Sequence, residues 1–328
     1  MSAASFGRAL VLSAGLGTRL RPLTLVRAKA AVPVDGEPLV RRVIAWLVSC
    51  GIADLVLNLH HRPDSITRTV GDGTDLGARV RYSWESRVLG SAGGPRRALP
   101  LLLDGGSRRS VLLVNGDTLT DVDLEALADL HRRSGALVTM ALIPNDWPDK
   151  YGGVLLDDAG CVTGFTRRGS STPSFHFIGV QAADADAFAR LPDGVPAESV
   201  VELYPQLMAE RPGSVMGFVS RAAFQDIGTP ADLLRTSLEL AAEGGRPGRP
   251  RWGRDVRVDD SALVERSLLW DEVVVGAGAR LVECIVADGV TIPAGAAFTR
   301  RAIVRANQEE LAPRNPRESA AGLLVAPL

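Results

Sequence analysis

A glycine turn followed by a run of cationic side chains is the part of this sequence best suited to chemistry. The segment AGLGTR contains the turn, and the residues concerned are Gly15, Gly17, Arg19, Arg21, Arg27 and Lys29. Glycines let backbone N–H groups face one cavity, which is a common way to bind polyphosphates. The turn matches neither GxGxxG nor GxxxxGK[ST], so dinucleotide and P-loop interpretations lose support. The pattern predicts a site for a phosphorylated ligand.

Lysine is almost absent from this chain, which draws attention to Lys29. Lys29 and Lys150 are the only lysines, although lysine and arginine together number 37. A lysine ammonium is a compact charge on a flexible stem, whereas arginine presents a planar fork. A lysine beside the glycine turn favours a chemical role for Lys29, and chance is the alternative that the composition leaves open.

Two aspartates that follow predicted strands are candidate ligands of a divalent cation. Asp117 ends the segment LLVNGD, and Asp226 stands in FQDIGTP. Mg²⁺ is commonly bound by one or two carboxylates together with phosphates of the ligand. The alternative for Asp117 is a turn, because NGD is also favourable turn chemistry. We expect Mg²⁺ as the cofactor, bound by Asp117 and Asp226.

The elements that must position these residues alternate between strand and helix over the first part of the chain. A helix is expected over EPLVRRVIAWLVSCG, one near DSITRTVG, one after LGSAGG, and one over DLEALADLHRRSG with Asp123 as its cap. The strands are expected at 9–12, 53–60, 78–84 and 110–117. This alternation predicts a doubly wound parallel sheet that binds ligands at the carboxyl ends of its strands.

The rest of the chain changes character twice. Residues 137–226 are rich in strands and predict an extension of the sheet, and a helix follows at 230–243. Residues 244–254 form a linker of glycine, proline and arginine. Beyond it, apolar residues recur at about six residues or near multiples, which is typical of a parallel β-helix; a small irregular β-domain is the alternative. The predicted domains are 1–243 and 255–305, and the tail 306–328 is expected to be a loose or partner-packing terminus.

Composition limits the classes of function. With 328 residues and 46% hydrophobic content, the chain can bury a large core, and its net charge of -1 gives no general attraction to nucleic acid or to an anionic membrane. The three cysteines are far apart and lack CxxC spacing, which favours a reducing cytoplasm. We expect neither a signal peptide nor a membrane span.

Five motifs occur together in an order that resembles one enzyme family. They are the stretch from Val11 to Val40, LGSAGG, VNGD, YGGV and DIGTP. Their order and spacing are similar to those of the sugar-1-phosphate nucleotidylyltransferases, in particular members like mannose-1-phosphate guanylyltransferase. The resemblance implies an α/β fold: a doubly wound, Rossmann-like mixed sheet (the nucleotide-diphospho-sugar transferase fold) followed by a parallel left-handed β-helix. It also implies that a sugar-1-phosphate oxygen attacks the α-phosphate of a nucleoside triphosphate and expels pyrophosphate.

The resemblance assigns roles to particular residues of this chain. Arg19 would neutralise the β- and γ-phosphates, Lys29 would hold the α-phosphate and the sugar phosphate, and Asp117 would act with Asp226 as magnesium ligand. The expected nucleotide-binding residues are Ala14, Gly15, Gly17, Thr18 and Gly90. The expected sugar-phosphate-binding residues are Gly152, Arg168, His176 and Glu198, of which His176 and Glu198 have packing or the surface as alternatives.

The sequence departs from the family at two places. Ala28 stands where the family usually has proline before its lysine, and GFTRRGS places Arg167 and Arg168 where many members have an acidic residue and a lysine. The expected substrates are GTP with mannose-1-phosphate or a related sugar phosphate. The alternatives are a thymidylyl-, uridylyl- or adenylyltransferase on glucose-1-phosphate, and a non-catalytic regulatory or scaffold homologue. An exposed end of the β-helix can pair with a second subunit, so we expect a homo-oligomer.

Overall fold

Two compact units make up the chain, and their segments interleave along the sequence. The computed structural model describes residues 6–104, 109–306, 318–319 and 322–328. Unit 1 comprises Met1–Gly15, Arg42–Pro63 and Val70–Gln225, and unit 2 comprises Leu16–Arg41, Asp64–Thr69 and Asp226–Leu328. Most of the cationic segment after the glycine turn therefore groups with the C-terminal part of the chain. The linear division at residues 243 and 254 stays a prediction.

Unit 1 contains a nine-stranded mixed sheet within the described part of the chain. Strand β1 is central and runs parallel to β4 and β6, whereas β11 runs antiparallel to β6 and β8. The predicted α/β sheet with a strand-rich extension is confirmed. The strands are β1 (Ala9–Leu12), β4 (Asp54–Leu59), β5 (Arg79–Trp84), β6 (Ser110–Asn115), β8 (Val138–Pro144), β9 (Gly153–Leu156), β10 (Val162–Thr166), β11 (Phe175–Asp184) and β12 (Val215–Val219). Two short strands, β7 (Thr118–Thr120) and β13 (Phe224–Asp226), form a separate pair.

Four of the five predicted helices form where local chemistry predicts, the helix predicted after LGSAGG begins earlier, and α5 and α6 lie in the stretch 137–226 where only strands were expected. Asp123 caps α4 by accepting hydrogen bonds from the N–H groups of Glu125 and Ala126 at 3.0 and 2.9 Å, as expected. The helix expected after LGSAGG instead begins inside that motif, at Gly90. The helices are α1 (Leu39–Ser49), α2 (Pro63–Val70), α3 (Gly90–Leu103), α4 (Leu124–Ser134), α5 (Ala185–Ala189), α6 (Tyr204–Glu210) and α7 (Pro230–Glu243), with single turns at Thr18–Leu20, Leu23–Leu25, Lys29–Ala31, Thr74–Leu76 and Ser199–Leu203.

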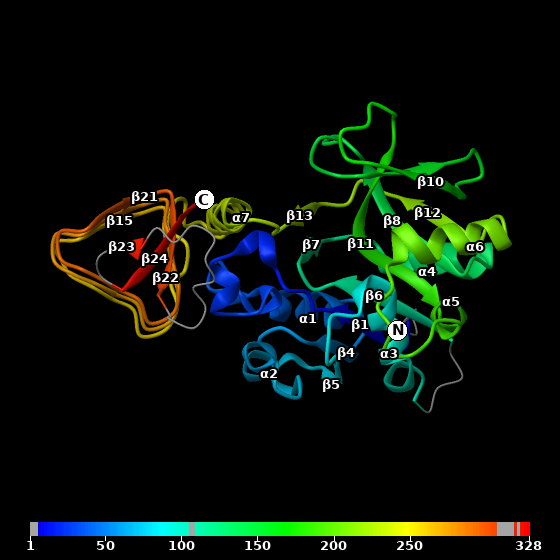
Figure 1. Cartoon of the computed structure of the whole chain (residues 1–328), viewed down its shortest axis with the longest axis horizontal. Coiled ribbons are helices and arrows are strands. Elements are labelled where there is room, and N and C mark those ends of the chain that lie inside the picture. The colour runs from blue at the N-terminus through cyan, green and yellow to red at the C-terminus, as the bar shows by residue number, and fades with distance from the viewer. Residues whose placement is uncertain (1–5, 105–108, 307–317, 320–321) are drawn as a thin grey trace. The chain divides into compact units, whose positions relative to one another are not determined.

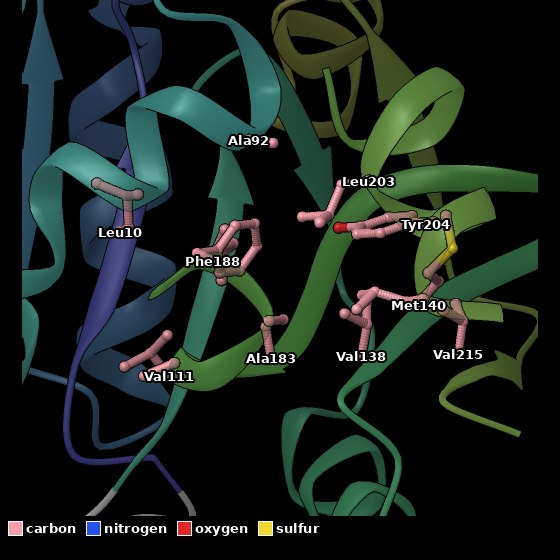
Figure 2. Close-up of a cluster of buried hydrophobic side chains, with 14 of the residues drawn as sticks. Leu10, Ala92, Val111, Val138, Met140, Ala183, Phe188, Leu203, Tyr204 and Val215 are labelled. Carbon is pink, nitrogen blue, oxygen red and sulfur yellow. The ribbon is translucent and has the colours of Figure 1, made fainter. Parts of the chain in front are cut away.

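The core of unit 1 lies between the sheet and its covering helices. Figure 2 shows Leu10 of β1 and Val111 of β6 in one cluster with Phe188 of α5 and Tyr204 of α6. The Tyr204 hydroxyl is buried and donates to Oε1 of Gln181 at 2.7 Å, so its polar atom is satisfied. Burial of each large side chain of this kind stabilises the fold by roughly 1.5–3 kcal/mol. This packing makes the strand ends a rigid base for a site.

Residues 257–305 of unit 2 wind into a regular coil, whose parallel strands form three short sheets (Figure 1). Arg257 pairs with Val274, 17 residues later, and Leu268 pairs with Ile285 at the same separation of 17. The predicted parallel β-helix is confirmed, and its turn of 17 residues explains why the apolar spacing drifts from a strict six. The strands are β14 (Arg257–Val258), β15 (Leu263–Glu265), β16 (Leu268–Leu269), β17 (Val274–Val275), β18 (Arg280–Val282), β19 (Ile285–Val286), β20 (Thr291–Ile292), β21 (Ala297–Thr299) and β22 (Arg301–Arg305).

The described part of the tail continues one face of the coil, which corrects the expectation of a loose terminus there. Strand β24 (Leu323–Pro327) pairs antiparallel with β22, and β23 (Glu318–Ser319) pairs with β24. Leu323 is 2% exposed and joins the core of the coil, because its apolar side chain covers the last turn. Residues 307–317 and 320–321 of the predicted tail lie outside the described residues.

Unit 2 also contains a small hairpin that precedes α1. Strands β2 (Pro33–Val34) and β3 (Glu37–Pro38) are joined by Asp35 and Gly36, both with positive φ, as in a two-residue Asp-Gly turn. Asp35 is 3% exposed, and Nη2 of Arg246 binds its carboxylate at 2.6 Å. The linker is thereby attached to the segment that carries the glycine turn. None of the helices in the described part of the chain is long and apolar enough to cross a membrane.

Candidate active site

The glycine turn folds back against the segment that carries Lys29. Gly17 has φ of +60°, and a Cβ there would lie 2.7 Å from Cγ2 of Thr24 and 3.2 Å from Cβ of Lys29. The Thr24 hydroxyl donates to the Gly17 carbonyl at 3.0 Å. Only glycine fits this conformation at such close approach. Unit 2 therefore brings together the predicted residues Gly17 and Lys29.

The motif DIGTP places a carboxylate beside an arginine of the turn segment. A Cβ on Gly228 would lie 2.9 Å from Nη1 of Arg19 and 3.0 Å from Oδ2 of Asp226. Thr229 then caps α7 in a capping box with Asp232, which fixes the direction in which the chain leaves the site. Arg19 and Asp226, predicted from separate motifs, thus lie at the same glycine of unit 2, and Thr18 is exposed next to Arg19.

In unit 1, the predicted residues lie at the carboxyl ends of central strands. The Gly116 N–H donates to the carbonyl of Leu12 at 2.9 Å, so Asp117 follows a turn held against the end of β1. Ala14 is buried and Gly15 is exposed just beyond the same strand. Ligands of α/β sheets bind at this edge.

A cavity of about 220 Å³ lies at the same edge of the sheet. Leu12 and Asn115, the last residues of β1 and β6, line it together with Ser91, Gln181 and Glu198. Apolar and polar side chains both face it, as in small-molecule sites.

Glu198 lies against the start of α3. Its Oε2 accepts from the Ser91 hydroxyl at 2.6 Å, and a Cβ on Gly90 would lie 2.6 Å from both its Oε1 and the Ala197 carbonyl. This close approach explains why the helix begins at Gly90, which has φ of +77°. The structure therefore groups Glu198, expected among sugar contacts, with Gly90, expected beside the base.

An aromatic cluster surrounds His176. Its ring stacks on Tyr151 with centroids 4.0 Å apart and lies 4.9 Å from the centroid of Phe224. Burial lowers the pKa of His176 to about 4, a hydrogen bond with the Gly152 backbone opposes the shift, and the charge of Lys150 adds to it. The imidazole is therefore neutral near pH 7. Its Nδ1 is buried without a hydrogen-bond partner among the described residues.

Gly152 and Arg168 lie beside each other in the same unit. A Cβ on Gly152 would lie 2.9 Å from the Thr166 carbonyl and 4.0 Å from the Arg168 nitrogen, so the backbone approaches closely there. The structure brings Gly152 to His176 and to the Arg168 backbone. Arg167 and Arg168 are both exposed.

A buried carboxylate supports the base of the glycine turn. Glu85 is 1% exposed, accepts from Nδ2 of Asn58 at 2.7 Å and accepts from the Leu89 N–H at 2.9 Å. Oδ1 of Asn58 in turn accepts from the Ser13 N–H at 2.6 Å. This network links the end of β1 to the start of α3. From the sequence, Glu85 is a candidate supporting or sugar-hydroxyl contact, with an exposed surface position as the alternative, and its burial excludes the surface position.

Asp117 and Asp226 offer the carboxylate oxygens that Mg²⁺ prefers. The described residues contain no group of three or more His, Cys, Asp or Glu side chains suited to a metal ion. The donors therefore fit a cation bound mainly by water and ligand phosphates, for which two carboxylates suffice. Because Asp117 belongs to unit 1 and Asp226 to unit 2, their joint binding of one cation stays a prediction.

Comparison with known proteins agrees with this fold. Residues 8–243 match the nucleotidyl transferase family, and residues 249–300 match the GlmU-like, C-terminal hexapeptide family. The chain therefore belongs to the nucleotidyl transferase family. The activity that these findings support is sugar-1-phosphate nucleotidylyl transfer.

Individual relatives give the degree of similarity. The chain is 31% identical over 302 residues to the mannose-1-phosphate guanylyltransferase of Mycobacterium tuberculosis, covering 89% of this chain and 83% of that protein. It is 28% identical over 305 residues to mannose-1-phosphate guanylyltransferase 1 of Arabidopsis thaliana, with 87% and 82% covered. The crystal structure of HddC from Yersinia pseudotuberculosis superposes with a TM-score of 0.61 at 20% identity, covering 72% of this chain and 100% of that one. That likeness supports the fold alone.

Proposed function

We propose that this enzyme transfers the guanylyl group of GTP to mannose-1-phosphate or a related sugar phosphate and releases pyrophosphate. The observation that carries the proposal is the 31% identity, over 302 residues, to a mannose-1-phosphate guanylyltransferase. The similarity reaches into the coil and is not confined to the glycine turn, because 89% of this chain is covered.

The proposed reaction is a single in-line displacement. An oxygen of the sugar phosphate attacks the α-phosphorus, and the bond to the β-phosphate oxygen breaks as pyrophosphate leaves. Lys29 would hold the α-phosphate and the incoming phosphate together, and Arg19 would neutralise charge that develops on the leaving pyrophosphate. Alignment and charge neutralisation suffice for such a transfer, and no covalent enzyme intermediate is required.

Asp117 and Asp226 would hold Mg²⁺, which when bound supplies positive charge to the phosphate oxygens. The carboxylate of Asp226 lies at the same glycine as the Arg19 guanidinium, so unit 2 contributes both a cation and a metal ligand. This pairing supports a role for the two side chains on the same triphosphate.

The proposed nucleotide subsite is formed by backbone rather than by side chains. Ala14, Gly15, Gly17 and Thr18 would direct backbone N–H groups at the triphosphate, and Gly90 would lie against the base. Because Glu198 packs on Gly90 and Ser91, it would fix the start of α3 in that subsite.

The proposed sugar subsite centres on Gly152 and His176. The place of His176 supports this role, since its ring lies beside Gly152 and stacks on Tyr151. Arg168 would meet the sugar phosphate from its exposed position, and the aromatic cluster would pack on the sugar ring. We also propose a homo-oligomer in a reducing cytoplasm.

Pyrophosphate release by the purified protein tests the proposal. The assay takes Mg²⁺ with each of GTP, ATP, UTP, CTP and dTTP against mannose-1-phosphate, glucose-1-phosphate and a heptose phosphate. A maximum at GTP with mannose-1-phosphate supports the proposal. A maximum at glucose-1-phosphate with another nucleotide replaces it with the thymidylyl-, uridylyl- or adenylyltransferase alternative. Nucleotide binding without turnover in any combination favours the regulatory homologue.

Substitution of Lys29 tests the mechanism. Lys29→Ala should lower kcat by about 100-fold or more, because the variant loses a charge from the transition state, while the nucleotide still raises the unfolding temperature. Arg133→Ala, which removes an exposed cation at the end of α4, serves as the control and should keep kcat within about twofold. Equal turnover in Lys29→Ala and wild type would exclude the assigned role.

A further inference from the structure

Arg27 lies two residues before Lys29, yet its side chain is bound by the coil. Nε and Nη2 of Arg27 donate to Oδ2 and Oδ1 of Asp288, both at 2.7 Å, and Nη2 also donates to Oδ2 of Asp271 at 2.9 Å. The side chain of Arg27 is only 14% exposed. A paired fork of this kind fixes orientation as well as charge. The sequence suggested Arg27 as a cation of the phosphate site, but its guanidinium is bound by Asp271 and Asp288 instead.

An aromatic ring completes the binding site for Arg27. The guanidinium carbon lies 5.4 Å from the ring centroid of Trp270, which is 1% exposed. A guanidinium over a buried indole is stabilised by its attraction to the ring face. Burial by itself lowers the pKa of Arg27, but the hydrogen bonds and charges of Asp288 and Asp271 outweigh it and raise that pKa above its ordinary value. Arg27 therefore stays charged although it is largely buried.

The two aspartates meet because the coil repeats every 17 residues. Asp271 and Asp288 occupy equivalent places on successive turns, and the Asp271 N–H donates to Oδ1 of Asp288 at 3.1 Å. Stacked carboxylates repel each other unless cations lie between or beside them. Nη2 of Arg254 binds Asp271 at 3.0 Å, and Arg27 bridges both. Asp271 and Asp288 of the coil thus form a negatively charged binding site for the guanidinium of Arg27.

The backbone between Arg27 and Lys29 is fixed at further points. The Arg27 N–H donates to the Leu23 carbonyl at 3.2 Å, and the Ala28 N–H donates to Oγ of Ser65 at 2.9 Å. Proline, which the family usually has at this position, carries no N–H and could not make the second bond. Since alanine leaves φ free where proline would restrict it, the contact of Arg27 with the coil supplies a restraint on the segment that leads to Lys29.

We propose that Asp271 and Asp288 are positioning residues of the transfer reaction, because by binding Arg27 they fix the segment that carries Lys29. The catalytic part of this inference rests on the proposed function. It gives the coil a part in turnover that is separate from assembly of subunits. Neither aspartate touches substrate; both act through Arg27 and the backbone that follows it.

The test compares Asp288→Asn, Asp271→Asn and Arg27→Gln with Glu283→Gln. Glu283 is the matched control, because it also binds two arginines, Arg266 on the preceding turn at 3.1 Å and Arg300 on the following turn at 2.8 Å, and its side chain is 26% exposed. The first three variants should lower kcat about 10- to 100-fold, since small misplacement of a reacting group costs this much. Their nucleotide-induced rise in unfolding temperature should stay as in wild type. Glu283→Gln should keep kcat within about twofold.

Arg27→Lys separates orientation from charge. It keeps the positive charge but loses the planar fork, so its kcat should lie between those of wild type and Arg27→Gln. Hydrogen exchange of residues 24–34 gives a readout that needs no turnover: amides there should exchange faster in Asp288→Asn than in wild type or Glu283→Gln. Unchanged exchange overturns the inference whether or not the enzyme has the proposed substrates. Faster exchange with wild-type kcat, or an equal loss of kcat in Glu283→Gln, overturns the positioning role. A wild-type protein without turnover would instead count against the proposed function.

Discussion

Replacement of His176 by phenylalanine should remove a pH dependence of folding stability. The imidazole is 8% exposed, it is stacked on Tyr151, and burial lowers its pKa to about 4 against 6.5 for an unshifted histidine. Between these two values the unfolded chain binds a proton at His176 and the folded chain does not. The free energy of unfolding therefore falls as the pH falls through this window.

The size of the effect follows from the shift. Each pKa unit corresponds to about 1.4 kcal/mol, so the full cost below pH 4 is roughly 3 kcal/mol. Lowering the pH from about 7.5 to about 5 should cost about 2 kcal/mol at this residue. The phenylalanine variant keeps a ring between Tyr151 and Phe224 but binds no proton at this position. Its free energy of unfolding should therefore not show the decrease that protonation of His176 causes.

The effect is measured by urea unfolding of wild type and His176→Phe at both pH values. The quantity compared is the loss of unfolding free energy between the two pH values in each protein. His131, whose pKa burial also lowers, is present in both proteins, so its contribution cancels. Wild type should lose about 2 kcal/mol more than His176→Phe over the pH interval. Parallel losses in the two proteins would refute the buried, neutral state of His176 and with it the account of its unsatisfied Nδ1.

Two glycine substitutions with matched controls test the close approaches in the site. Gly17→Ala should destabilise the fold by about 1–3 kcal/mol and lower kcat, because its Cβ meets Thr24 and displaces Lys29. Gly15→Ala is its control, because a Cβ there has nothing within 4 Å. This variant should keep its stability and weaken only nucleotide binding. Gly94→Ala should cost about 1–3 kcal/mol in urea unfolding, because its Cβ would lie 2.8 Å from Oε1 of Glu85. Gly164→Ala, whose nearest neighbour is 3.8 Å away, should change stability by less than about 0.5 kcal/mol.

Much of the fold could be predicted from local signals. Strand β1 and helix α7 have the predicted bounds, because a buried apolar run and a Thr-Pro start with amphipathic spacing are decided within a few residues. The start of α3 was misplaced, since it depends on contacts of Gly90 with Ala197 and Glu198, about a hundred residues away in sequence. The strand β24 was missed because a five-residue apolar run shows its partner strand only in the tertiary structure.

The candidate site divides in the same way. Glycine, arginine, lysine and aspartate at motif spacing indicated Gly17, Arg19, Lys29 and Asp226 from the sequence, because the chemistry of phosphate binding requires those residue types. The sequence could not tell which cations face a ligand. Arg27 belongs to the same basic run as Arg19, but only the 17-residue turn of the coil, which stacks Asp271 on Asp288, shows that it is bound elsewhere.

The sequence by itself determined the class of chemistry, the alternation of strands and helices in the first part of the chain, and the presence of a repeating coil, because these depend on residue type and short-range spacing. The tertiary structure alone decided the protonation state of His176, the support that Glu85 gives to the glycine turn, and the attachment of Arg27 to the coil. Burial and ion pairing depend on contacts between residues that are distant in sequence. They therefore cannot be predicted from a local sequence pattern.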